Sequence, residues 1–137
     1  MFLEDLKMGN QYELETLKFY TYTTYKLNND YKYDLLLDDS IKIEVKADRM
    51  TYKTNNICIE YECNNKPSGI SRSEASIYCY YVVKPDMGYD LYKIPVEDIK
   101  AMITNNLYKR SMNGGDGWRS KFYLFDISHF RKYQIII

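Results

Sequence analysis

The order of secondary-structure signals along this chain predicts a mixed α/β or α+β domain. A segment with helical periodicity comes first and three strand-like segments follow, after which come a helix, a hairpin, a further helix and a last strand. No internal repeat or linker-like stretch divides the 137 residues, so we expect one domain spanning residues 1–137. A chain of this length can bury a core without support from disulfides or a structural metal.

The first element is expected to be a helix from about residue 4 to residue 24. At 3.6 residues per turn, its apolar residues fall on one face that includes Leu6, Leu17 and Tyr20. Glu13 lies in the middle of this face. Because unpaired burial of a charge is costly, an acid on the inward face of a helix requires a partner. Glu13 is therefore the first candidate for a functional residue.

Two strand-like segments follow this helix and are joined by a turn. Residues 31–37 are rich in Tyr and Leu, and the Asp-Asp-Ser run at 38–40 predicts a hairpin turn. Residues 40–47 alternate strictly, with Ile and Val at odd positions and charged residues at even positions. This alternation puts one face on the core and leaves Glu44 and Lys46 together on the other face.

The rest of the chain alternates between strand and helix signals, with turns that contain Gly, Pro and Asn between them. In order, we expect a strand over 57–63, a loop over 64–72, a helix over 74–81, a hairpin of 80–84 with 89–94, a helix from Pro95 to about residue 106, a flexible loop over 113–117 and a strand over 121–127.

Composition and charge exclude several classes of protein. Hydrophobic residues make up 45% of the chain and charged residues 28%, which is typical of soluble globular domains rather than disordered chains. The net charge is +0, from 19 basic and 19 acidic residues, and this argues against a histone-like, purely electrostatic DNA binder. An enzyme that binds phosphate locally while keeping acids for a metal ion is still compatible with this balance.

The cysteines and the N-terminus bear on the cellular compartment. Cys58, Cys63 and Cys79 are odd in number and include no Cys-x-x-Cys pair, so neither a zinc site nor a disulfide framework is expected. No apolar run approaches the roughly 20 residues of a membrane helix, and the N-terminus does not look like a signal peptide. We expect an intracellular, cytoplasmic protein that contacts no membrane.

An acid–x–Lys triplet marks the candidate site, but position rather than the triplet itself is informative. The triplet occurs at Asp5–Lys7, Asp30–Lys32, Glu44–Lys46 and Asp98–Lys100. Of these, only the pair Glu44–Lys46 lies in the middle of a predicted strand with an acid, Asp34, available from the neighbouring strand across the hairpin. Two carboxylates and one ammonium group are therefore expected to converge.

Such a group of side chains suits phosphodiester chemistry. Carboxylates bind Mg²⁺ or Mn²⁺, which are hard cations that prefer oxygen ligands. The metal stabilises the charge that develops on the phosphodiester and lowers the pKa of its bound water. Lys46 can orient that water or neutralise phosphate charge. Because the acids would repel one another without metal, we expect metal binding to stabilise the fold.

These residues resemble the motifs of the PD-(D/E)XK nuclease superfamily. The family pattern has a proline directly before the acid of the first strand, and this chain has Tyr33 at that position. The later stretch 59–70 is similar to a segment of small phage- and virus-type members, which are Holliday-junction-resolvase-like or restriction-endonuclease-like. The matching motifs are Glu13 after Lys7-Met8-Gly9, then Tyr33-Asp34-Leu35-Leu36, and then Ile43-Glu44-Val45-Lys46.

The resemblance implies a fold and a site. The implied fold is a restriction-endonuclease-like αβββαβ core with a mixed central sheet flanked by helices. In the implied site, Mg²⁺ or Mn²⁺ is held by Glu13, Asp34, Glu44 and the backbone carbonyl of Val45. Asp34, Glu44 and Lys46 would be the catalytic residues.

Two further groups of residues are candidates for the surroundings of this site. Glu60 and Glu62 share the candidate face of their strand, although a solvated strand edge explains them as well. A second group, which could hold phosphate at the start of the predicted helix over 74–81, would otherwise form a plain capped loop. This second group consists of Lys66, Ser68, Ser71 and Arg72.

The sequence thus predicts a metal-dependent endonuclease that hydrolyses phosphodiester bonds in nucleic acid, with DNA favoured over RNA. Branched or nicked DNA of viral or phage recombination or repair is the candidate substrate, and a homodimer would let two sites cut two strands. One alternative is a catalytically inactive nuclease-fold protein for nucleic-acid binding or assembly. Another is a non-nuclease α/β domain whose acids form surface salt bridges with lysines.

Overall fold

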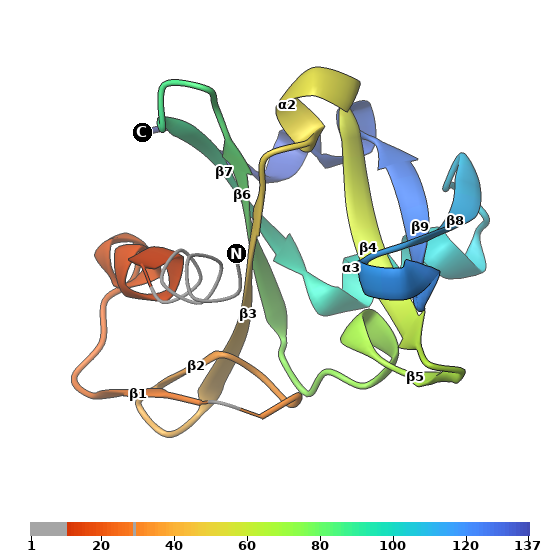
Figure 1. Cartoon of the computed structure of the whole chain (residues 1–137). Coiled ribbons are helices and arrows are strands. Elements are labelled where there is room, and N and C mark those ends of the chain that lie inside the picture. Colours follow the sequence, from red (N-terminus) through yellow and green to blue (C-terminus); the bar gives the residue numbers. More distant parts are fainter. Residues whose placement is uncertain (1–10, 29) are drawn as a thin grey trace.

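Two β-sheets packed face to face form the body of the protein in the computed structural model, which describes residues 11–28 and 30–137 (Figure 1). Within these residues the first sheet contains, in order, β1 (Tyr25–Leu27), β2 (Leu35–Leu37), β3 (Ile41–Asp48), β6 (Ile77–Val83), β7 (Tyr89–Pro95) and β10 (Gln134–Ile135). The second sheet contains β5 (Lys66–Pro67), β4 (Asn56–Cys63), β9 (Ser120–Asp126) and β8 (Arg110–Gly114).

The helices are short. An N-terminal helical segment, residues 11–16, continues into a 3₁₀ turn, η1 (Leu17–Phe19). The other helical elements are α2 (Thr51–Thr54), η2 (Gly69–Ser71), α3 (Val96–Thr104), η3 (Asp116–Trp118) and η4 (Ile127–Tyr133). In the described part of the chain, none of these helices has both the length and the apolar character needed to cross a bilayer.

The first sheet is mixed in strand direction. β1, β2 and β3 form an antiparallel meander, and the turn between β2 and β3 has left-handed backbone at Asp38 and Asp39, as type I′ turns require. β3 then pairs in parallel with β6, and β6 pairs antiparallel with β7. The coarse prediction of a mixed α/β domain with a mixed sheet is therefore confirmed.

The main core lies between the two sheets. The even-numbered residues of β6, among them Tyr80 and Val82, pack against Ile57 and Ile59 of β4 and Phe125 of β9. All of these side chains are at most 3% exposed. Because side chains alternate along a strand, the odd-numbered residues of β6 point to the other face of the first sheet.

That other face is covered by the N-terminal helical segment, which lies to the left of the first sheet in Figure 1. Tyr12 packs there with its ring centroid 4.8 Å from that of Tyr81. Thr16, which is fully buried, donates a hydrogen bond to the Tyr12 carbonyl at 2.7 Å and shares another with the Tyr81 hydroxyl at 2.8 Å. The inward residues of this segment are therefore Tyr12 and Thr16.

The predicted helix over 74–81 is wrong, because that stretch forms β6. β6 is the central strand and is buried on both faces, so its run Ile-Tyr-Cys-Tyr-Tyr-Val-Val shows no alternation of polar and apolar residues. A continuous apolar run of this length is compatible with either a buried helix or a buried strand. The connection from β3 to β6 consequently passes through the second sheet rather than through a helix.

Other boundaries also differ from the expectation. The first helix does not reach residue 24, because its α-helical part ends at residue 16 and residues 25–27 form the edge strand β1. Residues 4–10, including Leu6, lie outside the described residues. The strand expected over 57–63 exists as β4, but it belongs to the second sheet, so an αβββαβ order within one sheet is not seen. β8 extends into the loop expected at 113–117.

Two tyrosines on the same face of β6 give a matched test of the packing between the sheets. The Tyr80 hydroxyl donates to Asp48 Oδ2 at 2.5 Å and accepts from the Cys58 amide at 3.3 Å. Tyr80→Phe should therefore lower the free energy of unfolding by about 1–3 kcal/mol in denaturant titrations, because it leaves buried groups without a partner.

Tyr78→Phe is the control for this prediction. Within the described residues the buried Tyr78 hydroxyl has no hydrogen-bond partner, so its removal should cost little or nothing. Equal losses of stability in the two variants would contradict the prediction.

Candidate active site

The site begins where β2 stops pairing with β3. Leu35 is the first residue of β2 and lies opposite Ile43. The Asp34 amide still donates to the Ile43 carbonyl at 2.9 Å, but Oδ2 of Asp34 accepts the next amide, that of Val45, at 2.8 Å. A side chain thus replaces the strand backbone, and no residue of β2 lies opposite β3 beyond Ile43.

The open edge exposes backbone as well as side chains. In a β-strand the N–H and C=O of one residue point to the same side of the strand. Because the Val45 amide points toward Asp34, the Val45 carbonyl faces the side on which β2 has ended. This carbonyl is the one that the family resemblance assigns to metal binding.

Glu44 and Lys46 lie on one face of β3, as their alternation predicts. In the parallel register Glu44 is opposite Tyr78 and Lys46 is opposite Tyr80. Their surroundings differ, since Glu44 is only 7% exposed whereas Lys46 is exposed to solvent. The strand therefore presents a buried acid and a solvent-exposed cation two residues apart.

Asp34 and Glu44 form a carboxyl pair. Burial raises the pKa of Glu44 to about 8; Lys46 opposes this rise, and the charge of Asp34, a side-chain hydrogen bond with Asp34 and the charge of Glu13 add to it. A hydrogen bond between two carboxyl groups requires a proton on one of them. With a pKa of about 8, the Glu44 carboxyl therefore keeps its proton at neutral pH.

Glu13 approaches this pair from the N-terminal helical segment. Burial raises the pKa of Glu13 to about 7, and the charge of Asp34 raises it further. The helical wheel places Glu13 at the centre of the inward face, whereas in the structure that face is formed by Tyr12 and Thr16 and Glu13 is only partly buried. Glu13 therefore lies at the border of the packed face, close enough to Asp34 and Glu44 to affect their charge.

The ion pairs formed among the described residues do not include the acids of this site. Within the described residues no lysine or arginine forms an ion pair with Glu13, Asp34 or Glu44. Glu62, by contrast, lies 2.9 Å from the Lys121 ammonium group. A surface salt bridge therefore explains Glu62 but does not explain the carboxyl pair.

Tyr78 is a neighbour of the site that the sequence did not single out. Its hydroxyl is buried without a hydrogen-bond partner among the described residues. Burial raises its pKa, and the charges of Glu44, Asp34 and Glu60 raise it further, so the hydroxyl is a neutral donor beside the acids. The available signal was the Tyr-x-Tyr spacing at 78 and 80, which was hidden by the assignment of this stretch to a helix.

Glu60 and Glu62, expected on one face, have different environments. β4 has an irregularity in register between them, where it pairs with β9. Such a bulge changes the direction of successive side chains. Glu60 accepts a hydrogen bond from the Ser68 hydroxyl at 2.9 Å and lies near Tyr78, whereas Glu62 is ion-paired with Lys121.

The four residues predicted to hold phosphate are not at the start of the predicted helix, because residues 77–83 form the strand β6 instead. They lie in and around β5 and η2. Arg72 stacks on the Tyr31 ring at 3.4 Å from its centroid, and Ser68 is bonded to Glu60. Lys66 and Ser71 are exposed. The helix-based reason for this prediction is wrong, and a role of these residues in nucleic-acid binding stays a prediction.

The donors suit a hard divalent cation in kind but not in number. Within residues 11–28 and 30–137, no three acidic, histidine or cysteine side chains are gathered closely enough to hold a metal ion by themselves. The convergence of three carboxylates that the resemblance implies is therefore not seen among these residues, and Asp34 is the acid whose charge raises the pKa of both Glu13 and Glu44. A cation here would complete its oxygen ligands with the Val45 carbonyl, water or a phosphate.

Comparisons of this chain with family models, with curated proteins and with solved structures found no match. The resemblance to the PD-(D/E)XK superfamily therefore rests on the motif residues of the sequence alone.

The raised pKa values give a pH dependence of stability with a definite sign. The pKa of Glu44 rises from 4.5 to about 8 on folding, so the folded state binds more protons than the unfolded state between these values. Without divalent metal, stability should be full below pH 4.5 and should fall as the pH rises through 8. Glu44→Gln should remove much of this fall and stabilise the protein at pH 9 by about 1–3 kcal/mol.

Denaturant titrations at pH 5, 7 and 9 test this expectation. Glu62→Gln is the matched control, because Glu62 is ion-paired and its loss should bring no gain at high pH. A wild-type protein that becomes more stable between pH 5 and pH 9 would refute the assignment of the proton to the carboxyl pair.

Proposed function

We propose that this protein is a metal-dependent endonuclease that hydrolyses phosphodiester bonds in DNA. The observation that carries the proposal is the Asp34–Glu44 pair, which is held together at an open strand edge without a basic partner among the described residues. Buried neighbouring acids are costly for the fold, and a divalent cation that took the place of the Glu44 proton would offset the cost. Lys46 on the same face adds a positive group next to this position.

In the proposed site, Asp34, Glu44 and the Val45 carbonyl would hold Mg²⁺ or Mn²⁺, with Glu13 acting on the cation directly or through water. Once bound, the metal would polarise the phosphodiester and lower the pKa of its bound water. Because the Asp34 side chain is fixed by the Val45 amide, one carboxylate is oriented before any ligand arrives. Pre-oriented ligands lose less conformational entropy when they bind.

Lys46 and Tyr78 have complementary parts in this proposal. The Lys46 side chain is exposed and starts roughly 7 Å along the strand from Glu44, given a rise of about 3.3 Å per residue. It can therefore reach a phosphate that lies over the acids. The Tyr78 hydroxyl can donate to an oxygen of a ligand, which would satisfy a buried group that has no described partner.

The choice of DNA over RNA, the branched or nicked form of the DNA and a homodimeric state rest on the family resemblance alone. The neutral net charge supports local rather than extended contacts with the phosphate backbone. An inactive nucleic-acid-binding protein is the second candidate, favoured by the finding that no three metal-ligating side chains gather among the described residues.

Nicking of supercoiled plasmid in the presence of Mn²⁺ tests the nuclease proposal. Wild type should convert the plasmid to nicked circles, and no conversion should occur with EDTA. Glu44→Ala and Lys46→Ala should each lower the rate about 100-fold or more, because each removes a group placed at the reacting phosphate.

Lys42→Ala is the matched control for Lys46→Ala. Lys42 lies on the same strand and face, but its ammonium group is held by Glu74 at 3.2 Å, so its loss should leave the rate within about twofold of wild type. Activity that survives in Glu44→Ala would refute the proposal, and metal binding without any nicking would favour the inactive alternative.

Metal binding itself is predicted to stabilise the protein. Ca²⁺ or Mn²⁺ in millimolar excess should raise the melting temperature by about 3 °C or more at pH 7.5, because a ligand that binds only the folded state shifts the equilibrium toward it. The rise should be absent in Asp34→Asn and present in Asp38→Asn, which changes an acid of the β2–β3 turn. An equal rise in both variants, or none in wild type, would contradict the proposed ligands.

A further inference from the structure

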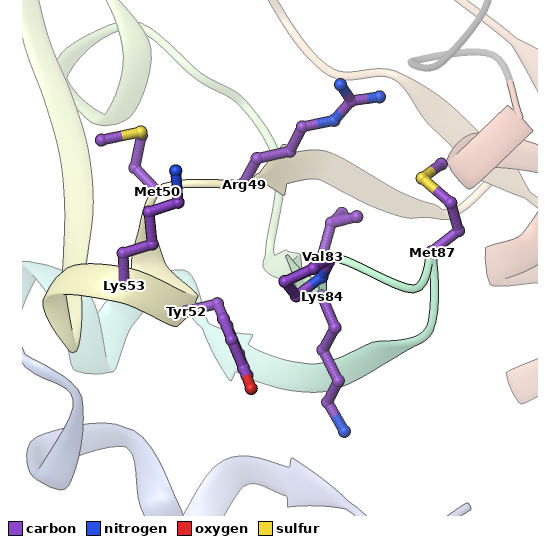
Figure 2. A pocket seen from close by; sticks show the side chains of 8 residues that line it. Arg49, Met50, Tyr52, Lys53, Val83, Lys84 and Met87 are labelled. Atoms are coloured by element: carbon purple, nitrogen blue, oxygen red, sulfur yellow. The ribbon is translucent and has the colours of Figure 1, made fainter.

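A pocket of about 390 Å³ lies at the other end of β3 from the carboxyl pair (Figure 2). It is formed by the segment after β3, by α2 and by the turn between β6 and β7. Because β3 and β6 are parallel, both strands end at this pocket. Its lining residues are Arg49, Met50, Tyr52, Lys53, Val83, Lys84, Pro85 and Met87.

The lining of this pocket combines exposed apolar side chains with positively charged ones. Met50, Tyr52 and Met87 are each more than half exposed, at 57%, 52% and 54%. Three cations and no acids line the pocket, in a protein whose net charge is zero. Lys84 is paired with Asp90 at 3.2 Å outside the lining. Exposed apolar side chains that gather in one place mark an interaction site.

The three cations of the pocket extend in two directions. In Figure 2 the ends of Arg49 and Lys53 extend to one side, and Lys84 extends to the other side together with the Tyr52 ring. A flat ring with an anionic group on either side of its point of attachment would match this arrangement. One nucleotide within a strand has that form, because its sugar carries the flat base and is flanked by a 5′ and a 3′ phosphate.

The pocket and the carboxyl pair are linked along the open edge of β3. Arg49 follows Lys46 by three residues, or roughly 10 Å in extended chain.

We propose that this pocket binds one unpaired nucleotide of a nucleic-acid strand that passes over Lys46, with its base against Tyr52 and its phosphates near Lys53 and Lys84. The inference rests on the proposed function for the identity of the ligand. It adds that the substrate has a single-stranded segment beside the cleaved bond, because a base within a duplex cannot lie against Tyr52. Base–aromatic stacking contributes about 1–3 kcal/mol per base and tolerates any sequence.

Fluorescence anisotropy with a labelled single-stranded oligonucleotide of about 12 nucleotides tests the pocket in EDTA, where no cleavage occurs. Wild type should bind this strand more tightly than the blunt duplex of the same sequence. Tyr52→Ala should weaken binding about fivefold or more. Lys53→Glu should weaken it as well and should reduce the slope of log K against log salt by about 0.7 or more.

Two matched controls carry the same chemical changes elsewhere. Tyr25→Ala removes a tyrosine that is 45% exposed on the edge strand β1, and Lys100→Glu reverses an exposed charge on α3. Both should bind like wild type. Equal affinity of Tyr52→Ala and Tyr25→Ala would overturn the proposal. An acidic peptide that binds wild type but not Lys53→Glu, with no oligonucleotide binding, would overturn it in favour of a protein partner.

The outcome of the oligonucleotide-binding test does not depend on the outcome of the plasmid-nicking test. Loss of oligonucleotide binding in the pocket variants of a protein that nicks no plasmid would support the pocket and reject the nuclease. Plasmid nicking by a protein whose oligonucleotide affinity is the same in all variants would reject the pocket and leave the nuclease standing.

Discussion

The hydrogen bond from the Val45 amide to Asp34 is the interaction on which the proposed site depends. It ends the pairing of β2 with β3, fixes one carboxylate and leaves the β3 edge open beyond it. Glu44 is brought against this fixed carboxylate by strand alternation, and Lys46 follows on the same face. A longer β2 would cover the edge with backbone, and the Asp34 side chain would no longer meet Glu44.

The acids of the site form no ion pair with a described lysine or arginine, and this bears on their role. Elsewhere in the described chain, acids such as Glu62 and Asp126 have lysine partners. At the site, one carboxyl has a pKa of about 8 and another of about 7, mainly because of burial. Groups whose pKa values are shifted by burial and by neighbouring charges cluster at functional sites. The second sheet adds Glu60, whose charge raises the pKa of Tyr78, so both sheets contribute to this environment.

The sequence predicted the parts that depend on local pattern. The alternation in β3, the turn at Asp38 and Asp39 and the approach of Asp34 to Glu44 follow from strand and turn chemistry within 15 residues, and all are present. β6 was missed because burial on both faces removes the alternation that identifies a strand. Tyr78 was missed with it, since its place beside Glu44 depends on a pairing between segments more than 30 residues apart.

The proton that Glu44 keeps at neutral pH, with its pKa of about 8, allows the most direct test of the central claim. A cation that takes this position must displace the proton, so Mn²⁺ binding measured by calorimetry in two buffers of different ionisation enthalpy should release about one proton at pH 7 and fewer at pH 9. Binding that releases no proton at pH 7, or no binding at all, would contradict the account.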